Sequence, residues 1–114
     1  MKLQDAFDIS KAHLLRQSRA SMSQNNPAYH GDNGHKCPAG IHIDASAIDS
    51  VIDRFDVREL IENHPAIRDM LMVDDVDHDI MVDFYLSMQI MHDNYLPSQW
   101  VEIMEGIATD FNLK

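Results

Sequence analysis

Residues that could carry chemistry are concentrated in one short part of the chain, residues 29–43. These fifteen residues contain three of the four glycines, three of the seven histidines and the only cysteine, Cys37. Histidine and cysteine side chains bind metals and act as bases and nucleophiles, while glycine permits backbone turns that other residues resist. The segment is therefore either a structural hairpin or a binding site.

A zinc site is the first candidate, because imidazole and thiolate groups are common zinc ligands. The four candidate ligands are His30, His35, Cys37 and His42. Structural zinc sites usually carry paired ligands about two to four residues apart, often with two or more cysteines, and here only His35 and Cys37 lie close together. This spacing favours histidines that pack in the hairpin or lie on the surface, so we predict no metal and no other cofactor.

A nucleophilic cysteine is the second candidate. Cys37 could attack a substrate if His13 or His92 served as its base and Asp93 oriented that base. A single cysteine followed by Pro-Ala-Gly is more typical of a small buried apolar side chain. We therefore expect a protein that is not an enzyme, whereas a Cys/His-dependent enzyme would need a Cys37 pKa well below about 8.5.

Anion binding is the third candidate, since glycine-rich turns expose backbone N–H groups and Arg16, Arg19 and Lys36 could neutralise a phosphate. The string GDNGHKCPAG lacks the hydroxyl residue that follows the lysine in phosphate-binding loops, and it lacks the spacing of a dinucleotide fold. A tight turn is the simpler interpretation. A polar pocket for a small anionic nucleotide signal stays open as an alternative.

The elements that would position these residues predict a mainly α (α+β) fold. We expect a helical single domain, residues 1–114, with one small β-hairpin near residues 28–43. The residue before Pro27 disfavours helical geometry, so the first helix is expected to end before it. The predicted helices cover residues 3–22, 45–55 after Asp44, 57–63 after Asp56, 65–72 from Pro65, 76–95, and a last one that Pro97 opens.

The segment 76–95 is expected to form the central helix, because its apolar side chains occupy most sides of a helix. One stripe consists of Ile80, Phe84, Met88, Met91 and Tyr95, and another of Val82, Leu86 and Ile90. One small domain would not cover such a helix completely, so a homodimer is a candidate arrangement. Its polar residues Ser87, Gln89 and His92 would need partners, since burying an unpaired polar group costs about 1–3 kcal/mol.

The charge of the chain limits its partners. Nineteen acids against nine bases give a net charge of −10, which opposes nonspecific binding to nucleic acid or to an anionic membrane. Six acids lie in residues 69–83, while Lys11, Arg16 and Arg19 lie near the N-terminus. The candidate contacts with a basic protein are Asp74, Asp75, Asp77 and Asp79. A single cysteine, and no apolar run long enough for a signal peptide or membrane span, predict a cytoplasmic location.

Several spaced residues resemble a family of small, mostly uncharacterised proteins of tailed bacteriophages and prophages. The resemblance covers residues 5–113 and rests on four groups: His13, Leu14, Gln17 and Ser21; Tyr29, Gly31, Gly34, Lys36, Cys37, Ala39 and Gly40; Gln89, His92 and Asp93; and Trp100. The chain departs from the family where Pro27-Ala28 replaces another cysteine and where Pro38 replaces a small residue. The histidines at 30, 35 and 42 are not part of the family pattern.

This resemblance implies a phage-encoded accessory protein that acts in the cytoplasm of the host cell. We expect it to bind a host defence or regulatory protein stoichiometrically and to inhibit or sequester it. The matching polar residues suggest that the first helix, the hairpin and the central helix meet, so that they lock the hairpin or line a ligand pocket. That set, with the nearby arginines, is His13, Arg16, Gln17, Arg19, Tyr29, Lys36, Cys37, Gln89, His92 and Asp93.

Overall fold

The computed structural model describes residues 1–49 and 51–114, and in this part of the chain it is mainly helical. The α-helices are α1 (Leu3–Gln17), α2 (Val57–Asn63), α3 (Pro65–Leu71), α4 (His78–Asn94) and α5 (Trp100–Asp110). Strands β1 (Met22–Ser23) and β2 (Asn26–Pro27) form a small antiparallel hairpin, and short 3₁₀ turns connect the remaining elements. The predicted fold class, mainly α with one small β-hairpin, is confirmed.

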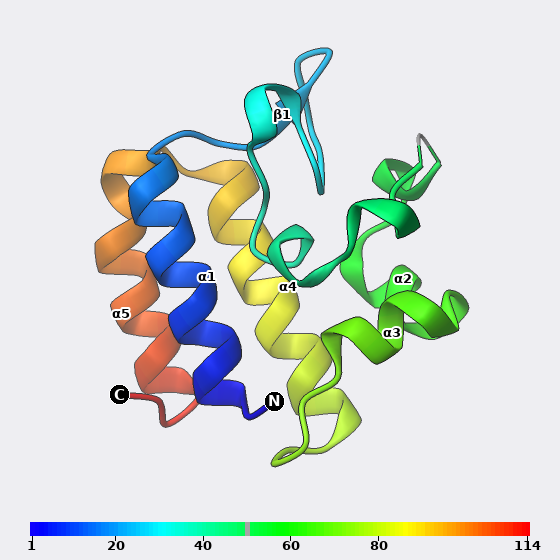
Figure 1. The fold of residues 1–114 in the computed structure, drawn as a ribbon. Helices are drawn as coiled ribbons and strands as arrows, with labels where there is room; N and C mark the ends of the chain where they lie inside the picture. The colour runs from blue at the N-terminus through cyan, green and yellow to red at the C-terminus, as the bar shows by residue number, and fades with distance from the viewer. Residues whose placement is uncertain (50) are drawn as a thin grey trace.

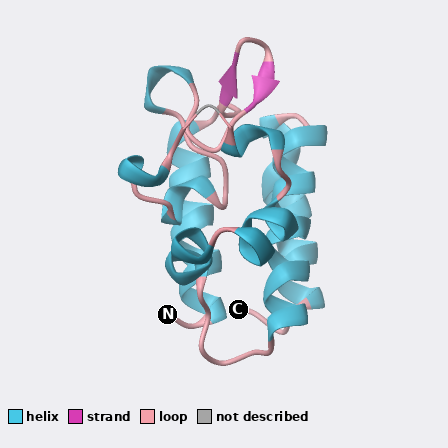
Figure 2. Ribbon diagram, turned by 90° about the vertical axis from the view of Figure 1, so that its right-hand side faces the viewer, coloured by secondary structure: helices cyan, strands magenta, loops and turns pink. Residues whose placement is uncertain are grey.

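The three longest helices lie side by side, with α5 contacting both α1 and α4 (Figure 1). Helices α2 and α3 cover the other side of α4, and the hairpin lies beyond the ends of the long helices (Figures 1 and 2). The two termini meet at the opposite end, where the Gln4 side chain exchanges hydrogen bonds with the backbone of Lys114. The hairpin and the loop that follows it contact the C-terminal ends of α1 and α4, which are far apart in the sequence.

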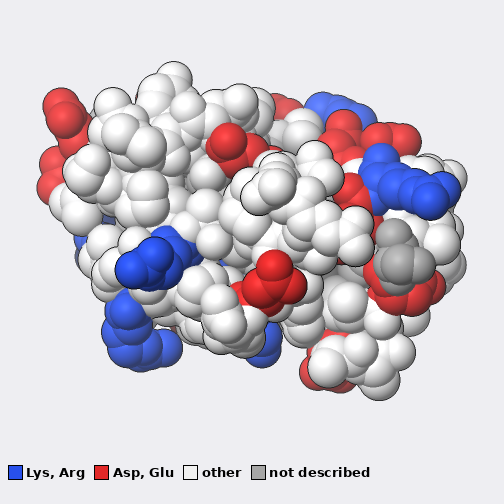
Figure 3. Space-filling model, turned by 90° about the horizontal axis from the view of Figure 1, so that it is seen from above, with Lys and Arg blue, Asp and Glu red and all other residues white. Residues whose placement is uncertain are grey.

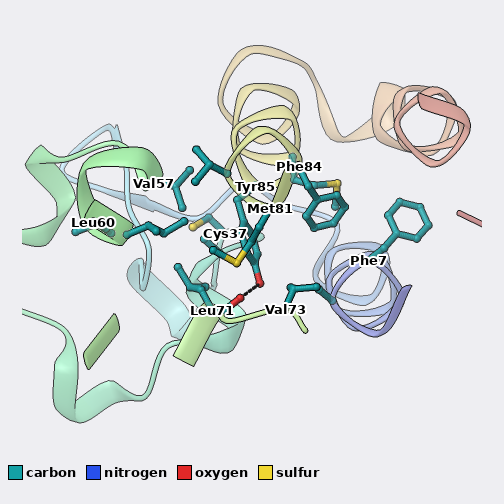
Figure 4. Packing of buried hydrophobic residues seen from close by; sticks show 14 of the residues in the cluster. Phe7, Cys37, Val57, Leu60, Leu71, Val73, Met81, Phe84 and Tyr85 are labelled. Carbon is teal, nitrogen blue, oxygen red and sulfur yellow. Dashed lines mark hydrogen bonds between the residues drawn. The ribbon is translucent and has the colours of Figure 1, made fainter. Parts of the chain in front are cut away.

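The core forms where the inner faces of these helices converge (Figure 4). Its largest fully buried side chains include Trp100, Tyr85, Phe7 and Phe84. The ring of Phe84 packs edge-on against Phe7 at 6.5 Å, and the Tyr85 hydroxyl donates to the Leu71 carbonyl at 2.7 Å. Burying a large apolar side chain contributes about 1.5–3 kcal/mol, so this cluster is the main source of the fold's stability.

The helix ends follow local capping signals. The Asp56 carboxylate accepts from the Glu59 N–H at 2.9 Å and Glu59 reciprocates, so α2 begins at the predicted residue. Asp77 caps α4 by accepting from the Ile80 N–H. The prediction for the first helix was five residues too long, because Ser18 takes a left-handed conformation, φ 56°, and terminates α1.

The predicted helix over residues 45–55 is wrong where the structure describes it. Residues Ala45–Ala47 and Ile52–Arg54 form two separate 3₁₀ turns, and Ser50 lies outside the described residues. The side chain of the expected cap, Asp44, accepts no capping hydrogen bond. Asp49 instead accepts from the N–H groups of Val51 and Ile52, which favours a turn over a continuing helix.

The hairpin lies slightly earlier in the chain than its predicted range. Gln24 and Asn25 form the turn between β1 and β2, and both have positive φ, as a two-residue type I′ turn requires. Within residues 28–43 the backbone forms a loop that is closed by one antiparallel bridge, between His30 and Lys36. The string HGDNGH therefore makes the tight turn of a second, smaller ribbon.

Helix α4 is less completely buried than its composition suggests. Its inner face consists of Met81, Val82, Phe84, Tyr85, Met88, Met91 and His92. Three residues that were assigned to apolar stripes, Ile80, Ile90 and Tyr95, are 41%, 54% and 48% exposed.

No helix among residues 1–49 and 51–114 combines the length and apolar character needed to cross a membrane.

Candidate functional site

The loop after the hairpin is fixed to α1 by the side chain of Gln17. Its Oε1 accepts from the Lys36 N–H at 2.8 Å and its Nε2 donates to the Lys36 carbonyl at 3.0 Å. The ring of His13 lies 2.8 Å from the same Oε1, one helical turn away. Gln17 therefore locks the loop by pairing with its backbone, and His13 contacts the side chain that does so.

Gln89 of α4 holds the other side of this loop. Its Oε1 accepts from the Ala39 N–H at 2.9 Å, next to Cys37. The Cys37 side chain is 1% exposed, and its Sγ accepts from the Gly40 N–H at 3.4 Å. Burial raises the pKa of Cys37 from the usual 9.0 to about 12, so the thiol form is strongly favoured.

His92 connects α4 to the start of the hairpin. Its Nε2 accepts from the Ser21 N–H at 2.8 Å, and its Nδ1 donates to an Asp93 carboxylate oxygen at 2.6 Å. The ring is buried and stacks on Trp100. Both nitrogens are thus occupied by structural partners, and neither is directed at Cys37 or at open solvent.

Tyr29 and Gly40 bring the two arms of the loop into very close contact. The Tyr29 N–H donates to an Asp53 carboxylate oxygen at 3.0 Å, and the Tyr29 hydroxyl donates to the Phe55 carbonyl at 2.7 Å. A Cβ added to Gly40 would lie only 2.0 Å from the Tyr29 carbonyl oxygen. This position accepts only glycine, which explains why the loop sequence contains Gly40.

A groove runs between the hairpin, the C-terminal half of α4 and the start of α2. We call it the hairpin groove, and it consists of two adjoining hollows of about 290 Å³ and 720 Å³. The inner hollow is lined by Pro27, Ala28, Tyr29, Cys37, Asp53, Phe55, Asp56, Val57, Leu86, Gln89, Ile90 and Asp93. The outer hollow shares Pro27, Asp53, Phe55, Asp56 and Asp93 with it and adds Ser23, Gln24, Asn26 and Arg54. The inner hollow therefore has an apolar floor and an acidic border.

The groove brings together some of the predicted ligand-binding residues. Tyr29, Cys37, Gln89 and Asp93 line its inner hollow. His92 does not line the hollow, but its hydrogen bond to the Asp93 carboxylate orients that side chain. The predicted cations are elsewhere: Arg16 borders a separate hollow with His13, Gln17, Gly34 and His35, and Arg19 borders another with His35. The charged side chains of the groove are mostly carboxylates, which disfavours an anionic ligand there.

The molecule is seen from above in Figure 3. Basic side chains gather at the lower left of this view and again at its right, where they lie among several acidic ones. The hollows bordered by Arg16 and Arg19 and the groove bordered by Asp53, Asp56 and Asp93 have different linings, so the cationic and the acidic candidate sites are separate.

Two of the three histidines of residues 29–43, His30 and His42, have separate side-chain partners. The His30 Nε2 lies 2.7 Å from the Gly40 carbonyl oxygen, and the His42 Nε2 lies 3.2 Å from the Ser10 hydroxyl. Among the described residues no three His, Cys, Asp or Glu side chains are grouped so as to hold a metal ion. His30 and His42 therefore help to pack the loop.

Three of the four acids predicted to bind a partner have local roles. Asp74 accepts from the N-terminal ammonium group at 3.1 Å, Asp75 accepts from the Leu3 N–H at 2.9 Å, and Asp77 caps α4. Asp79 is exposed in the first turn of α4. This cluster therefore joins the starts of α1 and α4 as well as adding surface charge.

Sequence reasoning missed several residues of the groove, chiefly Asp53, Phe55, Leu86 and Ile90. Asp56 was noted only as a helix cap, and Leu86 and Ile90 only as a second apolar stripe. That stripe was the one usable signal, because an apolar face next to Asp93 on the same helix can border a pocket.

No protein-family model, no curated protein and no solved structure matches the chain.

Proposed function

We propose that the chain is a phage-encoded accessory protein that binds a basic host protein stoichiometrically and so inhibits or sequesters a host defence or regulatory factor. The observation that carries this proposal is the hairpin groove, in which an apolar floor is bordered by Asp53, Asp56 and Asp93. The net charge of −10 adds long-range attraction for a basic partner. The phage origin follows the sequence resemblance.

Binding is favoured over catalysis because the candidate reactive groups have structural partners. Cys37 is buried with a raised pKa, and both His92 nitrogens are hydrogen-bonded. A cysteine nucleophile requires a thiolate and a base that can reach it. The geometry supports neither requirement at this site.

The acidic groove also replaces residues 74–79 as the preferred partner contact. Reversing the charges of Asp74, Asp75 and Asp77 would remove an ion pair and hydrogen bonds at the starts of α1 and α4, so a loss of binding would not identify a contact. Replacing the groove carboxylates by asparagine avoids this problem. An Asn side chain at 53, 56 or 93 keeps an oxygen for the hydrogen bonds that Tyr29, Glu59 and His92 donate.

Native mass spectrometry of the protein isolated from host lysate tests the proposal. We expect a one-to-one complex with a basic protein, and we expect salt to weaken it. The triple variant D53N/D56N/D93N should lose the complex. The control E102Q/E105Q/D110N, which removes the same charge from exposed positions outside the groove, should retain it.

Two results would contradict the proposal. If the protein carries a nucleotide whose retention depends on Arg16, Arg19 or Lys36, the sponge alternative is correct. If the purified protein turns over a substrate and Cys37→Ala abolishes the turnover, it is an enzyme. A homodimer would be recognised in the same spectra by its doubled mass.

A further inference from the structure

We propose that the inner hollow of the hairpin groove binds one arginine side chain of the partner protein. This inference rests on the proposed function, because it names the chemical group that the acidic groove recognises. The aliphatic part of the arginine lies on the apolar floor, and its guanidinium group lies among the carboxylates of Asp53, Asp56 and Asp93.

The three carboxylates are fixed acceptors that come from three different elements. One oxygen of each already accepts an internal hydrogen bond: Asp53 from the Tyr29 N–H, Asp56 from the Glu59 N–H, and Asp93 from His92. The second oxygen of each has no hydrogen-bond partner among residues 1–49 and 51–114. All three residues line both hollows, and the proposal places these second oxygens at their shared opening. Such preorganisation reduces the entropy that a ligand's binding must overcome.

The floor of the inner hollow suits an aliphatic chain. Val57 is fully buried, Leu86 is half-buried and Ile90 is 54% exposed, so apolar surface extends from the bottom of the hollow to its rim. Long basic side chains commonly lay their methylene groups on such a surface and keep the charged end in a polar environment. The volume of about 290 Å³ lies at the lower end of the range for small-molecule pockets, which suits one side chain better than a nucleotide.

The groove favours arginine over lysine. A guanidinium group has five N–H donors in one plane and can bridge carboxylates that lie on different sides of it, whereas an ammonium group is a compact, strongly hydrated charge. Guanidinium groups also stack on aromatic rings, and Phe55 lines both hollows. The Phe55 carbonyl is bound by the Tyr29 hydroxyl, which holds this part of the chain in place.

The test is an NMR titration of the intact protein with three small probes: N-acetyl-arginine methylamide and its lysine and citrulline counterparts. We expect the arginine probe to shift the amide signals of Phe55, Leu86 and Ile90, with the lysine probe weaker. Citrulline has the same shape without the charge, and its dissociation constant should be roughly tenfold higher or more, because hydrogen bonds to charged groups are the stronger ones.

The variants locate the contact. Asp53→Asn and Asp93→Asn should each weaken binding of the arginine probe several-fold, and Glu105→Gln, at an exposed position outside the groove, should leave its affinity unchanged. If the arginine and citrulline probes bind equally, or if the shifts lie near Arg16 and His35, the inference is wrong. Retention of the host complex by the wild type and its loss in D53N/D56N/D93N would then still support the proposed function. Arginine binding without any host complex would instead uphold the inference and contradict that function.

Discussion

The side-chain amide of Gln17 pairs with the backbone of Lys36 as a neighbouring strand would. The amide accepts from the Lys36 N–H at 2.8 Å and donates to the Lys36 carbonyl at 3.0 Å. The same Nε2 donates to the Arg19 carbonyl, so one side chain ties the end of α1 to the loop that carries Cys37. The floor of the hairpin groove is therefore held by a residue outside the groove.

Replacing Gln17 by alanine should loosen this loop. The change leaves the polar backbone groups of Lys36 without partners in a half-buried position, and an unsatisfied buried group costs about 1–3 kcal/mol. We expect a clearly lower melting temperature and faster hydrogen exchange at the Lys36 amide. Gln4→Ala is the matched control, since Gln4 makes the same kind of pair with exposed Lys114 and should matter much less. Equal effects of the two substitutions would contradict the role given to Gln17.

The example of Gln17 shows how much of the site the sequence could reveal. The resemblance pointed to Gln17, Gln89 and His92 as residues that meet at the loop, and the structure does bring them there. It could not show that their partners are backbone atoms of Lys36, Ala39 and Ser21. Backbone partners leave no trace in residue type, because any residue at those positions offers the same N–H and C=O groups.

Helix capping was the most reliable local signal. Asp56 and Glu59 form their capping box within four residues, so the start of α2 could be predicted from the sequence. The groove could not, because Asp53, Asp56 and Asp93 come together only after α2 has packed on α4. The position of the hairpin was also missed: Gln24 and Asn25 adopt positive φ without a glycine, and the richer glycine string nearby gave the stronger turn signal.

Two glycines should respond to alanine in opposite directions. At Gly40 the added Cβ would lie 2.0 Å from the Tyr29 carbonyl oxygen, so the two arms of the loop must separate and the protein should lose stability. At Gly106, inside α5, an added Cβ meets no atom within 4 Å, and alanine should stabilise the helix by about 0.5–1 kcal/mol. Chemical denaturation of both variants measures the direction of the change in unfolding free energy for each. A stable Gly40→Ala protein would show that the loop is not packed as described.

Cys37 should be inert in the folded protein. Burial raises its pKa from 9.0 to about 12, so near neutral pH the folded protein should react with iodoacetamide orders of magnitude more slowly than the unfolded chain. The same shift contributes stability that is complete below about pH 9 and is lost as the pH rises from 9 toward 12, because the unfolded thiol ionises first. Fast alkylation of native protein near neutral pH would contradict this environment and revive the nucleophilic reading of Cys37.

His42 should give the fold an acid-sensitive component. Burial lowers its pKa from 6.5 to about 4, since the ring is held beside the Ser10 hydroxyl and packs edge-on against Tyr85. The unfolded chain therefore takes up the proton first as the pH falls. The stabilising contribution is complete above about pH 6.5 and is lost progressively between pH 6.5 and 4.

Ring-proton NMR titration of His42 measures the shift directly, and unfolding of wild type and His42→Gln across the same pH range measures its consequence. As the pH falls through this window, we expect the wild type to lose unfolding free energy relative to His42→Gln, because glutamine has no proton to gain. A His42 midpoint at or above 6.5, or parallel pH profiles for the two proteins, would show that the ring is open to solvent. The contact between α1 and the loop at Ser10 would then be looser than the 3.2 Å distance indicates.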